Sequence, residues 1–151
     1  MSYTPAFNSV FFIGTQKPAS VVTDYTSDTW QQVTGIKSVG EIGDKVTEIK
    51  FETLDSPRPH KMKGTRDAGS FELTAGFLAN DPGQVAMRAA AASNDSTPFN
   101  FRVALKDGSI RYFSGLVMSA EGVTGSDANA VQMEKYTISI TGAPLIVLAA
   151  A

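Results

Sequence analysis

Hydrophobic and polar residues alternate with a period of two in several separate stretches of this chain. The clearest stretches are residues 70–78, 99–105 and 132–141. Residues 7–13, 45–54 and 109–118 also combine β-branched and aromatic residues with polar ones. A period of two predicts β-strands with one covered face and one wet face. The residues predicted to face inward on the first stretch are Phe71, Leu73, Ala75 and Phe77.

One stretch carries the signals of a helix instead. Asp81 can cap a helix whose first residue is Pro82, and Gln84 follows the cap by three residues, as in a capping box. The body, VAMRAAAAS, is rich in alanine, which is the best helix former. Asn94 and the polar run after it predict the end of this helix.

These elements predict a mainly β fold, an antiparallel β-sandwich or half-barrel with one short flanking α-helix. The length of 151 residues fits a single domain over residues 1–151. Residues 15–29 are polar and predict a loop. The N-terminal arm (residues 1–15) and the apolar C-terminal tail (residues 143–151) have no obvious partner among their neighbours in sequence, so we expect both to seek another surface, with a final strand at residues 145–148 as the alternative for the tail.

The connection between the strands predicted at 45–54 and 70–78 is unusually long. A hairpin between neighbouring strands needs about two to five loop residues, whereas residues 55–69 are predicted to form one long loop. This segment is basic, with four cationic and two acidic side chains, while the whole chain has a net charge of −2. A basic projection on an acidic body suits pairing with another copy of the same chain.

Composition excludes several classes of function. The net charge lacks the cationic excess needed for a firm, sequence-independent grip on nucleic acid. The absence of cysteine excludes disulfides, thiolate metal sites and a cysteine nucleophile. The N-terminus lacks the pattern of a signal peptide and the longest apolar run, residues 143–151, is half a membrane span, so we expect synthesis in a cytoplasm and no membrane binding.

No group of residues predicts catalysis. The one histidine, His60, lies among cations in the predicted loop, without the second hydrogen bond that a catalytic unit needs. We therefore expect no enzyme activity, no metal site and no cofactor. Trp30 and most phenylalanines are expected in the core rather than on a sugar-binding platform.

The block TWQQVTGIKSVGEIGDKVTEIKFETLDSPRPHKMKGTRDAGSFELTAGF resembles the tail tube (major tail) proteins of long-tailed bacteriophages. The resemblance rests on residues 30–40, on KGTRDAG at residues 63–69 and on the strand at residues 71–77. The following helix and the strand YTISITG are similar as well, so that it covers roughly residues 7–142.

The resemblance implies six-membered rings that stack into a hollow tube in the virion tail, assembled in the host cytoplasm. It further implies contact with a tape-measure protein, a tail terminator and distal tail proteins, and transient, non-specific passage of DNA. In this family the long loop reaches the neighbouring ring. The ring-stacking residues would then be Arg58, His60, Lys61, Lys63, Arg66 and Asp67.

A conduit for DNA should be mildly repulsive to phosphate. The expected lumen-facing carboxylates are Glu48, Glu52, Glu72 and Glu134, with an ordinary outer-surface position as the alternative for each. Two alternative functions stay open. One is the tube protein of a contractile tail or of a type VI secretion system, and the other is a carbohydrate-binding or adhesion β-sandwich.

Overall fold

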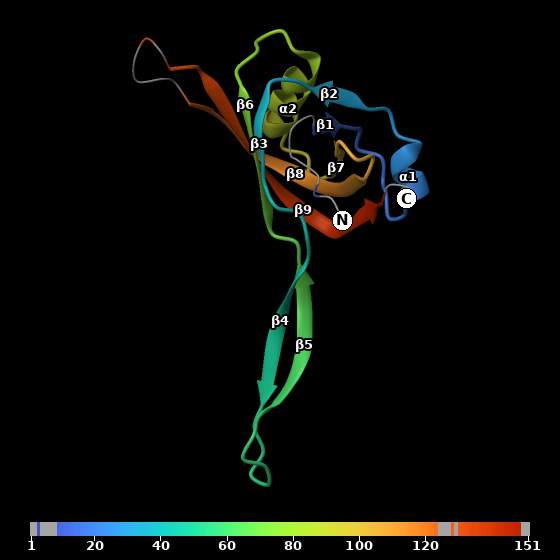
Figure 1. Ribbon diagram of the computed structural model, residues 1–151, viewed down its shortest axis with the longest axis vertical. Helices are drawn as coiled ribbons and strands as arrows, with labels where there is room; N and C mark the ends of the chain where they lie inside the picture. The colour runs from blue at the N-terminus through green and yellow to red at the C-terminus, as the bar shows by residue number, and fades with distance from the viewer. Residues whose placement is uncertain (1–2, 4–8, 124–127, 129, 149–151) are drawn as a thin grey trace.

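The computed structural model describes residues 3, 9–123, 128 and 130–148 of the chain. The described residues form nine strands and two helices (Figure 1). The first half contains β1 (Val10–Ile13), α1 (Val22–Thr26), β2 (Gln31–Val33), β3 (Ile36–Val39), β4 (Lys45–Phe51) and β5 (His60–Asp67). The second half contains β6 (Ser70–Gly76), α2 (Pro82–Ala92), β7 (Phe99–Ala104), β8 (Ile110–Val123) and β9 (Met133–Val147).

Seven of these strands form one antiparallel sheet in the order β2-β1-β7-β8-β9-β6-β3. Its two edge strands, β2 and β3, are consecutive in the chain and only Thr34 and Gly35 separate them. The sheet must therefore curl until its two edges approach each other. Gly35 makes the tight turn with a φ of 81°, and its carbonyl accepts a 2.7 Å hydrogen bond from the Gly76 amide. The predicted mainly β, antiparallel half-barrel is confirmed.

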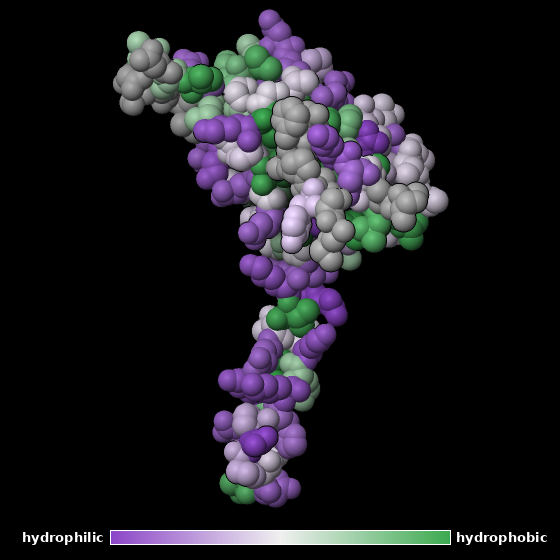
Figure 2. Space-filling view, in the orientation of Figure 1, coloured by the Kyte–Doolittle hydropathy of each residue, from purple (hydrophilic) through white to green (hydrophobic). Residues whose placement is uncertain are grey.

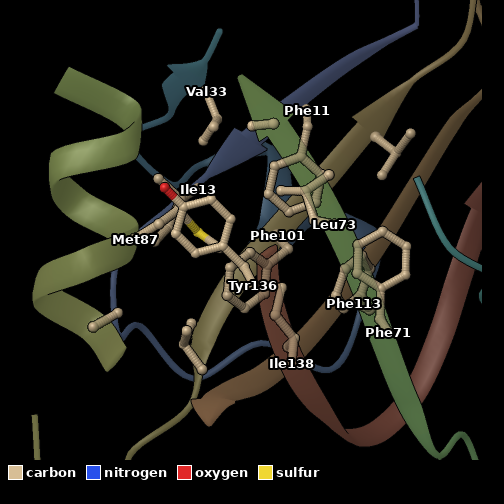
Figure 3. Close-up of a cluster of buried hydrophobic side chains, with 14 of the residues drawn as sticks. Phe11, Ile13, Val33, Phe71, Leu73, Met87, Phe101, Phe113, Tyr136 and Ile138 are labelled. Carbon is tan, nitrogen blue, oxygen red and sulfur yellow. The ribbon is translucent and has the colours of Figure 1, made fainter. Parts of the chain in front are cut away.

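Aromatic rings fill the interior of the curl (Figure 3). Phe11 on β1 and Phe71 on β6 belong to strands that are not neighbours in the sheet, yet their rings stack with centroids 5.8 Å apart. Phe113 lies 5.1 Å from Phe71 and 5.3 Å from Phe101. Such pairs stabilise a core beyond the area they bury. The buried core comprises Phe11, Ile13, Val33, Phe71, Leu73, Ala75, Met87, Ala90, Phe101, Val103, Phe113, Val117, Tyr136, Ile138 and Ile140.

Helix α2 covers the place where the two sheet edges meet. Asp81 caps it by accepting a 3.0 Å hydrogen bond from the Gln84 amide, and the same carboxylate accepts one from the Thr34 amide at 3.2 Å. The Gln84 side chain is fully buried and donates to the carbonyls of Thr34 and Gly76 at 2.8 Å each. The helix thus starts where the sequence predicts, but Gln84 ties the helix to the sheet.

Two expectations about the fold were wrong, one at residues 15–29 and one at residues 55–69. The predicted loop at residues 15–29 contains α1, and α1 places Tyr25 in a buried position where its hydroxyl meets that of Ser114 at 2.9 Å. The strand predicted at residues 7–13 is present as β1, which lies between β2 and β7, so the described part of the N-terminal arm has its partners within the subunit. The C-terminal tail continues β9, and its residues up to 147 pair with β8. The rest of both segments lies outside the described residues.

The second wrong expectation concerns the long connection. Residues 60–67 of the predicted loop 55–69 form β5, which pairs along β4, so that the loop prediction was wrong over most of its length. We call residues 45–67, which form this hairpin, the ribbon. It is a separate two-stranded sheet that projects away from the body (Figure 1). Its sequence does not alternate strongly enough to reveal a strand, because neither face of β5 is buried.

Candidate assembly surfaces

The ribbon has two chemically different faces. Residues paired across an antiparallel ladder share a face, and successive pairs alternate between faces. Ile49 pairs with Met62, and Phe51 pairs with His60, so these four side chains lie on one face. The other face carries the pairs Glu48–Lys63 and Lys50–Lys61. We call these the apolar face and the charged face of the ribbon.

The apolar face is exposed to an unusual degree. Ile49 is 45%, Phe51 58% and Met62 54% exposed. Gly64 lies beside Ile49, and a Cβ at this glycine would come within 3.0 Å of the Ile49 side chain. An isolated two-stranded hairpin is only marginally stable in water. Single apolar residues scattered over a protein surface are common and would need no explanation. Here they gather on one face of a projecting element, which marks an interaction surface.

All six residues predicted for ring stacking lie on the ribbon and are exposed. Arg58 is in the connection between β4 and β5, and the others belong to β5. Lys61 and Lys63 lie on the charged face, whereas His60 lies on the apolar face. The structure therefore gathers these residues, but it divides them between two faces.

The outer surface of β6 and β9 is a second candidate surface. Its side chains point away from the core and are mostly small and hydroxyl-bearing. The only charged pair among them is Lys135 and Glu72, whose side chains approach to 3.3 Å. The pairs that make up this surface are Ser70–Ser139, Glu72–Thr137 and Thr74–Lys135, with Thr141 next along β9. We call it the hydroxyl face.

The four carboxylates expected in the lumen do not share one surface. Glu72 is exposed on the hydroxyl face. Glu48 is on the charged face of the ribbon, 3.9 Å from Lys50 and 4.0 Å from Lys61, and Glu52 follows β4 in the connection at the ribbon tip. Glu134 is only 3% exposed, so its assignment to the lumen was wrong. It faces inward because it is two residues from Tyr136 on the same strand and shares its side.

Glu134 belongs to a buried ionic cluster beneath α2. Its carboxylate lies 3.0 Å from the guanidinium of Arg88, which also donates to the carbonyls of Leu78 and Ala79 at 3.4 Å and 3.1 Å. The Arg88 guanidinium stands 5.3 Å from the centre of the Phe77 ring. Burial raises the pKa of the neighbouring Tyr136 phenol, and the Glu134 carboxylate raises it further. This cluster fixes the connection between β6 and α2.

A second exposed apolar group lies at that connection. Phe77 and Leu78 follow β6 and are 43% and 44% exposed, and Val85 on α2 is 47% exposed. Val131 is 70% exposed and precedes Gln132, whose carbonyl accepts a 2.9 Å hydrogen bond from the Phe77 amide. We call these four residues the crown patch. Sequence reasoning missed this patch because alternation assigned Phe77 to the core.

The side chains that the structure describes include no group of three or more His, Asp or Glu residues able to hold a metal ion. In the same residues no helix is long and apolar enough to cross a membrane. Trp30, which could serve a sugar platform, is partly buried; its indole donates to the Tyr25 carbonyl at 3.1 Å and its ring lies 5.0 Å from the Arg102 guanidinium.

Comparison with known proteins identifies the family to which this chain belongs. The family described as "Phage tail tube protein, TTP" matches residues 14–149, which is most of the chain. The chain belongs to the phage tail tube protein family. It is therefore a structural component of the virion tail. No curated protein matches this phage tail tube protein.

Solved structures share the fold of this phage tail tube protein at low identity. One, titled as the sheath/tube terminator of an extracellular contractile injection system in its extended state, has a TM-score of 0.74 at 10% identity, covering 98% of this chain and 99% of that chain. The anti-feeding prophage cap, a tube-terminating cap, has a TM-score of 0.72 at 15% identity. The match covers 99% of this chain and 93% of that chain. The tail of an empty gene transfer agent particle, refined with C6 symmetry, has a TM-score of 0.61 at 15% identity. The match covers 91% of this chain and 96% of that chain.

Proposed function

We propose that six copies of this chain form a ring and that rings stack into a hollow tube through which viral DNA passes into the host cell. The observation that carries this proposal is the ribbon, a two-stranded sheet that projects from a closed body and exposes both of its faces. Such an element gains its stability from a neighbour. Membership of the tail tube family and the sixfold tail of the similar gene transfer agent particle support the ring number.

The hydroxyl face is the surface best suited to line the lumen. Two oppositely charged side chains, Glu72 and Lys135, pair with each other, and the remaining hydroxyls carry no charge. A surface of this kind offers DNA phosphates little net attraction, so the cargo would not stall. Glu72 thus keeps its proposed place in the lumen. Glu48 and Glu52 belong there only if the charged face of the ribbon also turns inward.

Stacked rings leave two different ends on a tube, because a head-to-tail interface repeats without closing along the axis. One end would present free ribbons and the other would present the surface that receives them. We propose that the tail terminator and the distal tail proteins occupy these two ends, and that the tape-measure protein occupies the lumen during assembly. The similar contractile systems leave a surrounding sheath as the second candidate arrangement.

Electron microscopy of the purified protein over a range of concentration tests the tube. We expect hollow tubes above a critical concentration, with sixfold symmetry in cross-section. A particle that stays a single subunit at every concentration and salt tried would overturn the proposal. Addition of the sheath protein encoded beside it, if one exists, would separate the contractile from the non-contractile arrangement.

A further inference from the structure

The ribbon and the crown patch lie at opposite ends of the body. Strand β6 starts at Ser70, directly after the ribbon ends at Asp67, and it finishes at Gly76, directly before Phe77. In Figure 1 the ribbon projects from the bottom of the body, whereas the connection between β6 and α2 lies at the top. Figure 2 shows hydrophobic atoms among hydrophilic ones both along the ribbon and on the upper part of the body.

Both surfaces are apolar and lack a cover within the described part of the subunit. Ile49, Phe51 and Met62 are each about half exposed, as are Phe77, Leu78 and Val85. Removal of this apolar surface from water favours association of the two surfaces. Because the two surfaces belong to opposite ends, one subunit cannot satisfy them by self-contact, but a second copy placed above it can.

We propose that the apolar face of the ribbon, formed by Ile49, Phe51 and Met62, docks on the crown patch of a second copy of this chain in the next ring. This inference rests on the proposed tube and names the two surfaces that hold successive rings together. A β-strand of seven residues extends about 23 Å, so the ribbon can lie across a neighbouring subunit instead of touching only its rim.

Charge favours a second copy as the occupant. Residues 45–67 contain six cationic and four carboxylate side chains, a net charge of +2. A total of −2 for the chain leaves −4 for the rest of it. The cationic ribbon is therefore attracted to the body of another copy, while its charged face, opposite the docked one, stays in contact with solvent.

The crown patch is also pre-organised to receive the ribbon. Arg88 binds the carbonyls of Leu78 and Ala79 and lies against the Phe77 ring, and Glu134 holds Arg88 from below. A fixed patch loses little conformational entropy on docking, which favours binding. This gives the buried carboxylate of Glu134 a positioning role at the interface between rings.

Disulfide cross-linking of assembled tubes tests this docking, and the natural chain contains no cysteine that could interfere. Variants with Leu78→Cys and either Phe51→Cys or Met62→Cys are oxidised after assembly. Each docked pair joins a head to a tail, so we expect a ladder of linked subunits on a denaturing gel. Matched controls combine Leu78→Cys with Lys50→Cys or Lys61→Cys, which lie on the charged face beside the same cross-strand pairs, and these should give no ladder.

The outcomes separate the docking from the tube itself. Tubes with ladders only from the charged-face variants, or with no ladder from either apolar-face variant, would overturn the docking and leave the tube standing. Wild-type protein that never forms tubes would overturn the tube and the docking with it. As a second measurement, Met62→Ser should raise the critical concentration at least tenfold, whereas Met62→Leu and the charge-preserving Lys61→Arg should leave it near the wild-type value.

Discussion

Arg88 on α2 and Glu134 on β9 form an ion pair of 3.0 Å in which the carboxylate side chain is only 4% exposed. Removing one member of such a pair leaves a buried charge without its partner and typically costs about 3–5 kcal/mol. The Arg88 side chain is 28% exposed, which places the expected loss near the lower value. The pair therefore couples the stability of the subunit to the position of the crown patch.

We expect Arg88→Met to lower the free energy of unfolding by about 3 kcal/mol, because Glu134 is then buried without a counter-charge. Urea unfolding of the single subunit below its critical concentration measures this loss. The double variant Arg88→Met with Glu134→Leu should recover most of it, since no buried charge remains. Equal stability of Arg88→Met and the wild type would contradict the buried ion pair.

Gly83→Ala tests the fit of α2 against the sheet. A Cβ at Gly83 would clash with the carbonyl of Gln32 and with the Cα of Val33, both of which are backbone atoms that cannot rotate away. Alanine alone would favour the helix by about 1 kcal/mol, but the clash should cost about 1–3 kcal/mol and reverse the sign. Thermal unfolding should therefore show a lower Tm for Gly83→Ala.

Gly43→Ala is the matched control for this substitution. A Cβ at Gly43 meets no atom within 4 Å, so the Tm should not fall. A higher Tm for Gly83→Ala would show that α2 can move away from β2 at little cost.

Asp28 should make the subunit sensitive to acid. Burial alone would raise the pKa of this carboxyl, but hydrogen bonds from Thr15, Asn100 and Thr29 outweigh it, and the net effect lowers the pKa. A lowered folded-state pKa contributes stability above the unfolded value of about 3.9, and this contribution is lost as the pH falls through the folded-state pKa. Acid should therefore weaken the attachment of residues 15–30 to β7.

The variant Asp28→Asn tests whether the Asp28 carboxylate stabilises the subunit at neutral pH and loses this effect in acid. It should be less stable than the wild type at pH 7, and the difference should shrink below about pH 4, where the Asp28 carboxyl of the unfolded wild-type chain begins to take up a proton. Denaturant unfolding at a series of pH values between 7 and 2.5 measures the difference. A difference that stays constant over this whole range would show that the carboxylate charge contributes nothing.

Reversing charge on the hydroxyl face should slow the passage of DNA. Glu72→Lys leaves Lys135 unpaired and adds a second cation, so phosphates should be held in the lumen. We expect particles that assemble normally and release their DNA more slowly, with Glu72→Gln showing a smaller delay. Added salt should shorten the delay because it screens the attraction.

The control for this effect is Thr23→Lys, which adds a cation at an exposed position on α1, away from β6 in Figure 1. It should release DNA at the wild-type rate. Equal delays for Glu72→Lys and Thr23→Lys would place the hydroxyl face outside the lumen.

The charged face of the ribbon should set the rate of assembly more than its strength. Charge complementarity chiefly accelerates encounter, and salt weakens it. Lys61→Glu with Lys63→Glu should slow tube growth, followed by light scattering, and the defect should diminish as salt is added. A defect of the same size at low and high salt would mean that these lysines are buried in the contact.

Sequence reasoning located the ribbon and its cationic residues, but it did not reveal that one face of the ribbon is apolar and exposed. It grouped Arg58, Lys61 and Lys63 on one projection, because a run of cations between two strands is visible without a structure. It also predicted a strand with one covered face at residues 45–54, but the structure leaves Ile49 and Phe51 on this strand exposed.

A pattern of neighbouring residues does not show which distant residue will contact them, and this explains why Glu134 was wrongly assigned to the lumen. The alternation of β9 places Glu134 on the side of Tyr136, but glutamate is usually exposed, and the sequence shows no partner for a buried carboxylate at this position. Only the docking of α2 brings Arg88 to it as a counter-charge, and the two residues are far apart in the sequence. Residues 15–29 were misjudged for a related reason, because α1 is short and acquires its buried Tyr25 from contact with β8.

The sequence by itself determined where this phage tail tube protein forms most of its strands, where α2 begins and that the segment after β4 would project. These features follow from the period of apolar residues, the helix cap and the local charge, all of which involve residues close together in the chain. Only the tertiary structure decided that β2 and β3 become the two edges of one curled sheet, that β4 and β5 leave it, and that two apolar surfaces remain at opposite ends. Those outcomes depend on pairings between distant residues, and a local pattern carries no information about which distant partner will cover it.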